Sequence, residues 1–467
     1  MVKAYPKYQN TRLPWLEKMP DRWQIKRGKA VFRCIDVRSK DGAEELLTVS
    51  SKDGVVPRSS KKITMFMAES YVGYKLCWPG DLVINSLWAW MFGLGFSRYH
   101  GIVSSAYGVY RPQGQYLDYW KYFDYLFRSK AYDWELRVRS QGIWTSRLQL
   151  TDERFLDMPV LIPPKEEVIG IVSFLSMLDI QIRRYIREKQ KVINFLNEQN
   201  QAIIIKAVLR GINPKCRLKS SCAKWMGDVP EHWDVRKLKF EMNFSGGGTP
   251  SKAVESYWDG NIPWVSPKDM KSEIIYDTED HITEQAVAES STKIVPQGSI
   301  LMVVRSGILQ RTIPIASCGR PVALNQDIKA LTSKGRVNPE YFVLLVRGCE
   351  KALLLEWTKQ GATVESIEHQ FLANSYIPIP PKEEQTAIVQ YIKKETASFN
   401  RSIDVIKQEI RLLKEYRDRL IADVTTGKIA VNDIKLPEIM ALDQQELIEE
   451  EIQDEIEDSE EVVNADE

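Results

Sequence analysis

The chain has 467 residues, more than one hydrophobic core usually supports, so we expect at least two domains. Its six scattered cysteines and four histidines argue against a disulfide framework and a metal site, and its longest apolar run, residues 87–96, is too short to span a membrane. Residues 438–467 hold 14 acidic and no basic side chains, which leaves 64 basic against 49 acidic in residues 1–437. The basic excess predicts that residues 1–437 attract polyanions, unless these charges are ordinary solvated surface charges. The start of the sequence has no hydrophobic stretch typical of a secretory signal, so we expect a cytoplasmic protein.

Residues 1–160 are predicted to form a first globular domain of mixed α and β structure. Short β-type runs rich in aromatic residues, among them residues 46–58, 79–90 and 101–112, lie between turn-forming segments. Basic side chains near the predicted strand ends are candidates for DNA contacts, because Arg pairs with guanine and Lys holds phosphate. These candidates are Arg58, Lys61, Lys62, Arg98 and Arg147. Each of them has an alternative interpretation as a solvated charge.

A long helix is predicted within residues 161–212. Two prolines at 163–164 favour a helix start, Glu166 and Glu167 place negative charge at its positive end, and Gly211 provides a C-terminal cap. Apolar residues recur at steps of three and four, which indicates a coiled-coil seam. The predicted seam residues are Ile171, Leu175, Leu178, Ile182, Tyr185, Val192, Leu196 and Ile203.

Residues 213–378 are predicted to form a second globular domain. The glycines at 246–248 lack the GxxxxGK[ST] arrangement of a phosphate cradle, so we interpret them as a tight turn that lets the backbone approach DNA. Trp258 and Trp264 are interpreted as core residues rather than base-stacking platforms. The candidates for DNA contacts in this domain are Gly247, Thr249, Ser251, Lys252, Lys268, Arg305 and Arg311.

A second long helix is predicted within residues 379–428, and residues 429–467 are predicted to be an acidic, disordered tail. The seam of this helix comprises Ile388, Ile392, Phe399, Ile403, Ile406, Ile410, Leu413 and Leu420. At about 1.5 Å per residue, about 42 residues would give each helix a length of about 60 Å. The two helices either pair with each other as an antiparallel coiled coil about a pseudo-two-fold axis or join two copies of the chain.

The chain contains one internal duplication. The spacing of Trp15, Pro20 and Trp23 is repeated 210 residues later by Trp225, Pro230 and Trp233. The motif IPPKEE occurs at Ile162 and again at Ile379, at an offset of 217 residues. The fold class predicted from this pattern is α+β, with two globular domains that are each followed by a long helix.

The motifs GGTPS and YWDGNIPWVSPKD, together with IPPKEEQ and the terminal TGK, resemble the target-recognition pattern of type I restriction-modification specificity subunits. The resemblance covers nearly the whole chain except the acidic tail. In the first domain, LLTVSSKDGVV and GDLVINSLWAW resemble a different subclass of recognition domain. The resemblance implies a non-catalytic subunit of a phage-defence system, with each domain recognising half of a bipartite DNA site and the helices setting the gap.

The same resemblance implies the partners and their cofactors. Two modification subunits would bind S-adenosylmethionine and methylate adenine, and restriction subunits would translocate and cleave DNA with ATP and Mg²⁺. No Walker A motif, [DN]PP[YF] motif or GxGxxG loop occurs in this chain, so we expect catalysis and cofactors in the partners. Two alternatives stay open: an enzyme with diverged motifs, which would turn over DNA alone, and a stand-alone DNA-binding regulator or coiled-coil adaptor, which would bind its target tightly alone.

Overall fold

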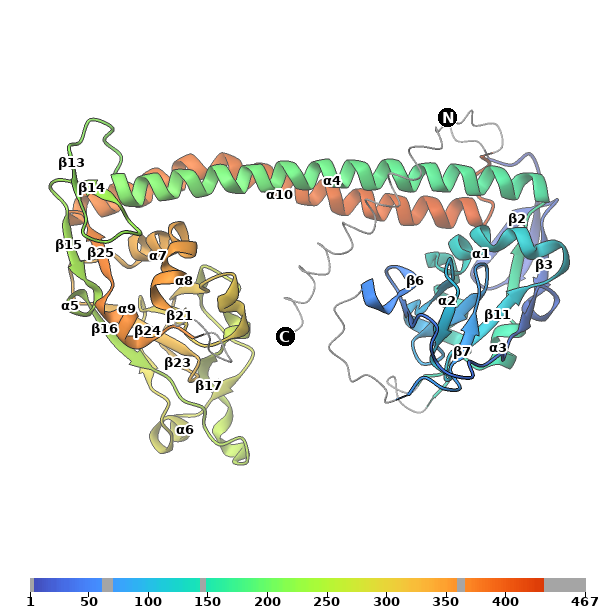
Figure 1. The fold of residues 1–467 in the computed structure, drawn as a ribbon, viewed down its shortest axis with the longest axis horizontal. Coiled ribbons are helices and arrows are strands. Elements are labelled where there is room, and N and C mark those ends of the chain that lie inside the picture. Colours follow the sequence, from blue (N-terminus) through green and yellow to red (C-terminus); the bar gives the residue numbers. More distant parts are fainter. Residues whose placement is uncertain (1–3, 61–69, 143–147, 359–365, 432–467) are drawn as a thin grey trace. The chain divides into compact units, whose positions relative to one another are not determined.

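The computed structural model divides into two compact units, each of which contains one globular domain and parts of both long helices (Figure 1). Unit 1 comprises residues 1–189 and 408–467, and unit 2 comprises residues 190–407. The long helices are α4 (Lys165–Arg210) and α10 (Lys382–Thr425), which have 46 and 44 residues. The structure describes residues 4–60, 70–142, 148–358 and 366–431. The candidates Lys61, Lys62 and Arg147 and the tail beyond residue 431 lie outside the described residues.

The domain of unit 1 is organised around a four-stranded antiparallel sheet with the order β4-β11-β8-β9. These strands are β4 (Phe32–Cys34), β11 (Gly108–Pro112), β8 (Leu82–Ile84) and β9 (Leu94–Phe96). Two-stranded pairs surround the sheet: β1 (Tyr8–Leu13) with β2 (Leu16–Pro20), β3 (Gln24–Arg27) with β12 (Pro159–Ile162), β5 (Leu47–Ser50) with β6 (Gly54–Pro57), and β7 (Lys75–Cys77) with β10 (Gly101–Val103). The short helices are α1 (Trp120–Phe127), α2 (Asp133–Arg139) and α3 (Asp152–Leu156).

The core of unit 1 is aromatic. The ring of Phe32 lies 5.2 Å from that of Phe123 and 5.7 Å from that of Phe155, so β4, α1 and α3 meet in one cluster. Such ring pairs stabilise a core beyond the area that they bury.

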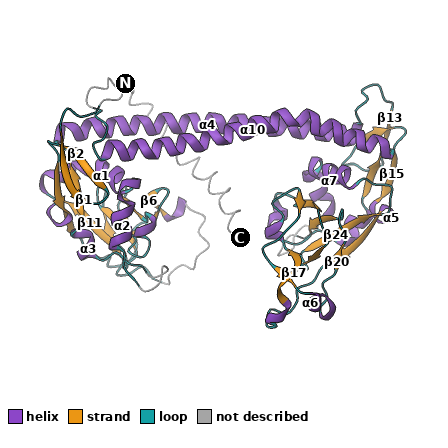
Figure 2. Ribbon diagram, turned by 180° about the vertical axis from the view of Figure 1, so that it is seen from behind, coloured by secondary structure: helices purple, strands orange, loops and turns teal. Residues whose placement is uncertain are grey.

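The domain of unit 2 contains two larger sheets, which Figure 2 shows in orange. A five-stranded sheet has the order β16 (Met242–Gly246), β24 (Ile328–Ser333), β21 (Ile300–Val303), β22 (Ile315–Cys318) and β18 (Ile274–Ile275). A four-stranded sheet has the order β19 (His281–Ile282), β17 (Trp258–Val265), β23 (Val322–Leu324) and β20 (Ile294–Val295). The remaining pairs are β13 (Leu218–Ser220) with β14 (Asp228–Pro230) and β15 (Asp234–Lys237) with β25 (Tyr376–Ile379). The short helices are α5 (Leu238–Glu241), α6 (Glu284–Glu289), α7 (Pro339–Gly348), α8 (Glu350–Trp357) and α9 (His369–Asn374).

The mixture of helices and sheets that the sequence predicts is confirmed. The first residues of each domain pack against the end of the helix that starts in the other repeat. A Cβ atom at Gly427, which follows α10, would lie 3.4 Å from the ring of Trp23 and against Pro20. In unit 2, a Cβ atom at Gly211, which follows α4, would lie 3.2 Å from the ring of Trp233. Each of the two repeated tryptophans therefore packs against the C-terminal end of a long helix.

A buried tyrosine fastens each of these junctions. In unit 1, the hydroxyl of Tyr122 lies 3.2 Å from the carbonyl oxygens of both Leu161 and Thr425. In unit 2, the hydroxyl of Tyr341 lies 3.3 Å from the carbonyl oxygen of Pro378 and 3.1 Å from that of Val208. Burial raises the pKa of both hydroxyls well above the ordinary value, so they remain neutral donors. Each tyrosine thus joins the last strand of its domain to a helix end from the other repeat.

We predict that Gly427→Ala destabilises unit 1 by about 2–3 kcal/mol, because alanine combines left-handed strain with overpacking against Pro20. The φ angle of Gly427 is +75°. Gly73→Ala is the matched control, since Gly73 has a φ of +80° and open space around its Cβ position. Chemical denaturation of both variants measures the difference. Equal losses would show that contact with Pro20 contributes nothing.

The predicted seam residues Ile171, Leu175, Leu178, Ile182, Leu196, Ile203, Ile388, Ile392, Phe399, Ile403, Ile406, Ile410, Leu413 and Leu420 are all buried or half-buried. The prediction is wrong at Tyr185 and Val192, whose exposed fractions are 49% and 44%. Ile193 is buried instead, because it lies 11 residues after Ile182, about three full helical turns, and so returns to the same face of the helix. Another difference concerns the tail: Ile429 and Val431 pack against the unit 1 core, beyond the predicted helix boundary at residue 428.

Among the described residues, no helix combines the length and the apolar character needed to cross a lipid bilayer.

Candidate nucleic-acid interface

The glycine-rich segment of unit 2 lies between the two sheets of its domain. Gly247 and Gly248 follow β16, and the amide of Gly248 donates to the carbonyl oxygen of Leu324 at 2.8 Å. A Cβ atom at Gly247 would collide with the carbonyl oxygens of Leu324 and Asn325. A Cβ atom at Gly248 would collide with Ser291. These two glycines are therefore explained by close packing inside the protein, which corrects our interpretation of the turn as an approach to DNA.

Two tryptophans hold the loop that follows these glycines. The indole nitrogen of Trp264, a buried residue, donates to the carbonyl oxygen of Gly248 at 3.0 Å. The indole nitrogen of Trp258 donates to the carbonyl oxygen of Ser251 at 3.3 Å, and the two rings pack edge to face at 5.3 Å. Both side chains belong to or pack against one hydrophobic cluster. They position the loop.

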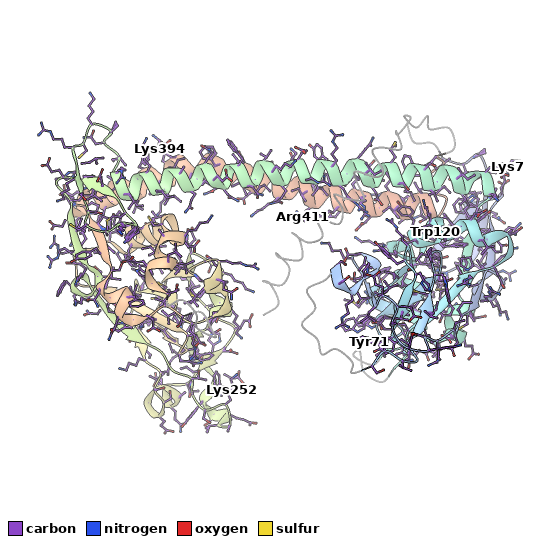
Figure 3. The ribbon with its side chains drawn as sticks, viewed as in Figure 1. Lys7, Tyr71, Trp120, Lys252, Lys394 and Arg411 are labelled. Atoms are coloured by element: carbon purple, nitrogen blue, oxygen red, sulfur yellow. The ribbon has the colours of Figure 1, made fainter. Side chains whose placement is uncertain are left out.

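The loop presents polar side chains at the surface. Thr249, Ser251 and Lys252 are exposed, and the hydroxyl of Thr249 donates to the side-chain oxygen of Gln326. Figure 3 shows Lys252 at the end of the unit 2 domain that is farthest from the helix segments of the same unit. The loop thus combines a fixed backbone with accessible donors, as a surface that contacts phosphates or bases requires.

Arg305 meets the same region from the end of β21. Its Nε donates to Oδ1 of Asp327 at 2.8 Å, and its side chain remains 56% exposed. Asp327 also accepts hydrogen bonds from Asn325 and Gln326, so the β23–β24 turn links Arg305 to Thr249. An exposed ion pair of this kind contributes little stability, but it orients the guanidinium.

The structure argues against one predicted contact. Nζ of Lys268 lies 2.9 Å from Glu279 and 3.0 Å from Asp280, and hydrogen bonds to Glu279 and then Asp280 raise its pKa. Because two carboxylates already compensate its charge, Lys268 is a poor choice for a phosphate ligand. Arg311 is exposed after the 3-10 helix Gly307–Gln310.

In unit 1, the described candidates are Arg58 and Arg98. Arg58 follows β6 and is half-buried, and its charge opposes the burial that raises the pKa of Tyr107. Arg98 follows β9 and is exposed. The two arginines follow different strands, β6 and β9.

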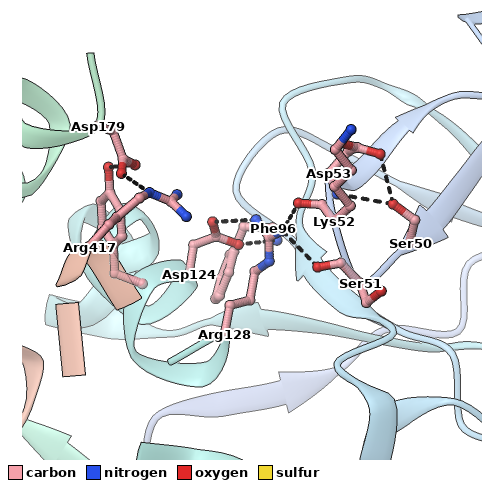
Figure 4. A network of polar contacts seen from close by, with 10 residues as sticks. Ser50, Ser51, Lys52, Asp53, Phe96, Asp124, Arg128, Asp179 and Arg417 are labelled. Atoms are coloured by element: carbon pink, nitrogen blue, oxygen red, sulfur yellow. Dashed lines mark hydrogen bonds and ion pairs between the residues drawn. The ribbon is translucent and has the colours of Figure 1, made fainter. Parts of the chain in front are cut away.

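The hairpin that carries Arg58 is attached to α1 by Arg128, a residue that the sequence did not single out (Figure 4). Nη2 of Arg128 donates to the carbonyl oxygens of Ser51 at 3.2 Å and Lys52 at 2.5 Å, and Nη1 lies 3.5 Å from Asp124. A second carboxylate oxygen of Asp124 accepts from the amide of Phe96 at 2.9 Å. This network fixes the β5–β6 turn against the central sheet.

Sequence reasoning also missed Gln326, Asp327 and Lys329. Lys329 pairs with Gly246 across the five-stranded sheet, and its Nζ lies 3.2 Å from Nδ1 of His369. Burial lowers the pKa of Lys329, and burial together with the Lys329 charge lowers the pKa of His369. The sequence feature that could have identified them is the polar segment at residues 325–327, which directly follows a buried strand. Functional side chains are common in loops at such positions.

Across the described residues, no group of His, Cys, Asp and Glu side chains is arranged to hold a metal ion.

Residues 230–412 match the family model of the type I restriction modification DNA specificity domain. The specificity subunit of the type I restriction enzyme EcoR124I/EcoR124II from Escherichia coli is 38% identical over 182 residues, which are 38% of this chain and 45% of the relative. The second half of this chain is therefore similar to the DNA specificity domain of type I specificity subunits.

A more distant relative matches over a greater length. The type I restriction enzyme MjaVIII specificity subunit from Methanocaldococcus jannaschii is 21% identical over 437 residues, which are 89% of this chain and 95% of the relative. The match to the E. coli specificity subunit, by contrast, spans less than half of that protein. A solved structure from a study of complex assembly and conformational transition of the type I R-M system has a TM-score of 0.61 at 15% identity. It covers 88% of this chain and 99% of that chain, and at this identity the likeness concerns the fold.

Proposed function

We propose that this chain is a type I specificity subunit that recognises a bipartite DNA sequence, with one half bound by each unit, and that it has no catalytic centre of its own. The observation that carries the proposal is a repeated frame around two different domains. Trp23 with Tyr122 and Trp233 with Tyr341 make equivalent junctions. The sheets between these junctions differ in strand number and order. A common frame with unlike surfaces suits the recognition of two unlike half-sites.

We further propose that α4 and α10 pair as an antiparallel coiled coil with pseudo-two-fold symmetry, which sets the unread gap. Within unit 1, Arg417 donates to Asp179 at 2.6 Å, and Lys189 lies 2.7 Å from Glu409. Within unit 2, the side-chain Nδ2 of Asn200 donates to Oδ1 of Asn400 at 2.8 Å. The residue numbers rise along α4 as they fall along α10, which supports the antiparallel direction. A polar pair such as Asn200 with Asn400 can specify the register of a seam.

The partners follow from the family. Two modification subunits that use S-adenosylmethionine would methylate adenine, and restriction subunits that use ATP and Mg²⁺ would cleave DNA. Two equivalent helix junctions offer two equivalent docking positions to identical modification subunits. The proposed DNA contacts in the described residues are Arg58, Arg98, Thr249, Ser251, Lys252, Arg305 and Arg311, with Gly247 supporting the loop; Lys61, Lys62 and Arg147 stay predictions.

Long-read sequencing of host DNA tests this function. Deleting the gene in a host that expresses the partner genes should remove one split methylated adenine motif, and returning the intact gene should restore it. Retention of every split motif after deletion would contradict the proposal. Purified chain incubated alone with DNA and S-adenosylmethionine is the control for intrinsic activity, and turnover there would favour an enzyme.

Arg305→Ala should change base preference in only one half of the split motif, because Arg305 belongs to the unit 2 loop cluster. Loss of one base contact is expected to relax discrimination at that position by about 1–3 kcal/mol. Arg320→Ala is the control, since Arg320 is exposed in the same domain and donates to the carbonyl oxygen of Asn261 outside this cluster. Methylome sequencing of both variants gives the preference at each position. An unchanged motif and rate for Arg305→Ala would remove Arg305 from the interface.

A further inference from the structure

A cysteine, a histidine and a glutamate from separate parts of unit 2 form a chain of contacts beside the β13–β14 hairpin. The strand register pairs Leu218 with Pro230, so Cys216 and His232 face each other where the hairpin opens. Sγ of Cys216 lies 3.5 Å from Nδ1 of His232. Nε2 of His232 lies 2.8 Å from Oε2 of Glu384, in the first turn of α10. This order of thiol, imidazole and carboxylate is the arrangement that activates a nucleophile.

The repeat provides an internal comparison for Glu384. The equivalent residue in unit 1, Glu167, accepts a hydrogen bond from Nε1 of Trp23 at 2.8 Å. In unit 2, Nε1 of Trp233 is buried and has no hydrogen-bond partner among the described residues. A buried donor without a partner is destabilising, so the frame alone does not explain why Glu384 contacts His232. The unit 2 carboxylate thus contacts an imidazole, whereas the equivalent unit 1 carboxylate contacts an indole.

A surface pocket of about 300 Å³ adjoins the thiol. It is lined by Cys216, Arg217, Glu231 and His232, so it offers a nucleophile, a base, one positive and one negative side chain. The resting thiol also donates a hydrogen bond to the carbonyl oxygen of Arg217, at 3.5 Å. The paired charges suit a small zwitterionic molecule.

We propose that Cys216 is a reactive thiol that forms a mixed disulfide with low-molecular-weight disulfides of the amino-acid type. Glu384 accepts a hydrogen bond from Nε2–H of His232, which leaves the Nδ1 lone pair directed at the thiol. Nδ1 takes the thiol proton, the thiolate attacks one sulfur of the disulfide, and a new S–S bond forms as the original one breaks. The released thiolate takes the proton from His232. One thiol and one disulfide enter, and one mixed disulfide and one thiol leave, without another oxidant.

The experiment exposes the full chain to oxidised glutathione and follows each cysteine by peptide mass mapping. Cys222 and Cys34 are exposed free thiols and serve as internal references. We expect Cys216 to gain glutathione about tenfold faster than Cys222, because His232, oriented by Glu384, lies where it can take the thiol proton as the sulfur attacks. Equal rates at Cys216 and Cys222 in the unmodified chain would overturn the proposal without recourse to any variant.

Two variants separate chemistry from local structure. His232→Ala should lower the Cys216 rate to that of Cys222, and added imidazole should restore it while leaving Cys222 unchanged. Glu384→Gln should lower the Cys216 rate, whereas Glu383→Gln, an exposed neighbour in the same helix turn, should not. A selective Cys216 rate that persists in His232→Ala would also overturn the proposal.

Discussion

Replacing Arg111 with alanine is expected to destabilise unit 1 by about 3–5 kcal/mol, because the change leaves a buried carboxylate without its partner. The side chain of Asp81 is 1% exposed. Its Oδ1 lies 2.6 Å from Nε of Arg111, and its Oδ2 lies 2.7 Å from Nη2. The guanidinium also lies 5.0 Å from the ring centroid of Trp78. Arg111 thus joins β11 to the start of β8 through charge, hydrogen bonds and ring contact.

Denaturant unfolding followed by hydrogen exchange of unit 1 peptides measures this loss. Arg137→Ala is the matched control, since Arg137 pairs with Asp133 on an exposed face and its loss should cost about 1 kcal/mol or less. A double variant, Asp81→Ala with Arg111→Leu, should recover part of the stability because no buried charge remains. If Arg111→Ala and Arg137→Ala unfold alike, Asp81 is more hydrated than its burial indicates.

Inserting one heptad into both long helices should lengthen the unread gap of the methylated motif. The insertions belong directly after Asn200 and directly before Asn400, so that the facing seams gain the same length. Seven residues extend a helix by about 10.5 Å, which corresponds to about three base pairs at about 3.4 Å each. The two half-sites should keep their sequences, because the loop clusters are untouched.

Methylome sequencing gives the gap directly. An insertion in α4 alone is the control, since it breaks the register between Asn200 and Asn400 and should abolish methylation rather than respace it. A doubled insertion that leaves the gap unchanged would show that the helices do not set the spacing. An insertion of four residues in each helix would displace the seam around the helix and should reduce activity.

The sequence predicted local features well and tertiary contacts poorly. The prolines at 163–164 and Gly211 placed the limits of α4 within a few residues, because caps and breakers act locally. The partners of Gly247 and Lys268 were not predictable, since the first meets a backbone about 78 residues away and the second meets Glu279 and Asp280 through a turn. The repeated Trp and Pro positions indicated that the two halves are homologous. They did not indicate that each tryptophan packs against the end of the helix that starts in the other repeat.

Each unit is completed by the end of a helix that starts in the other repeat, and the two helix ends are synthesised at different times. The two units therefore become complete at different stages of synthesis. Unit 2 is one continuous stretch, and its fastening contact from Tyr341 to Val208 spans 133 residues. Unit 1 is discontinuous, and its contact from Tyr122 to Thr425 spans 303 residues. Closing a longer loop carries a larger entropic penalty and waits for later chain to emerge from the ribosome. The N-terminal domain, although made first, is therefore the last to be closed.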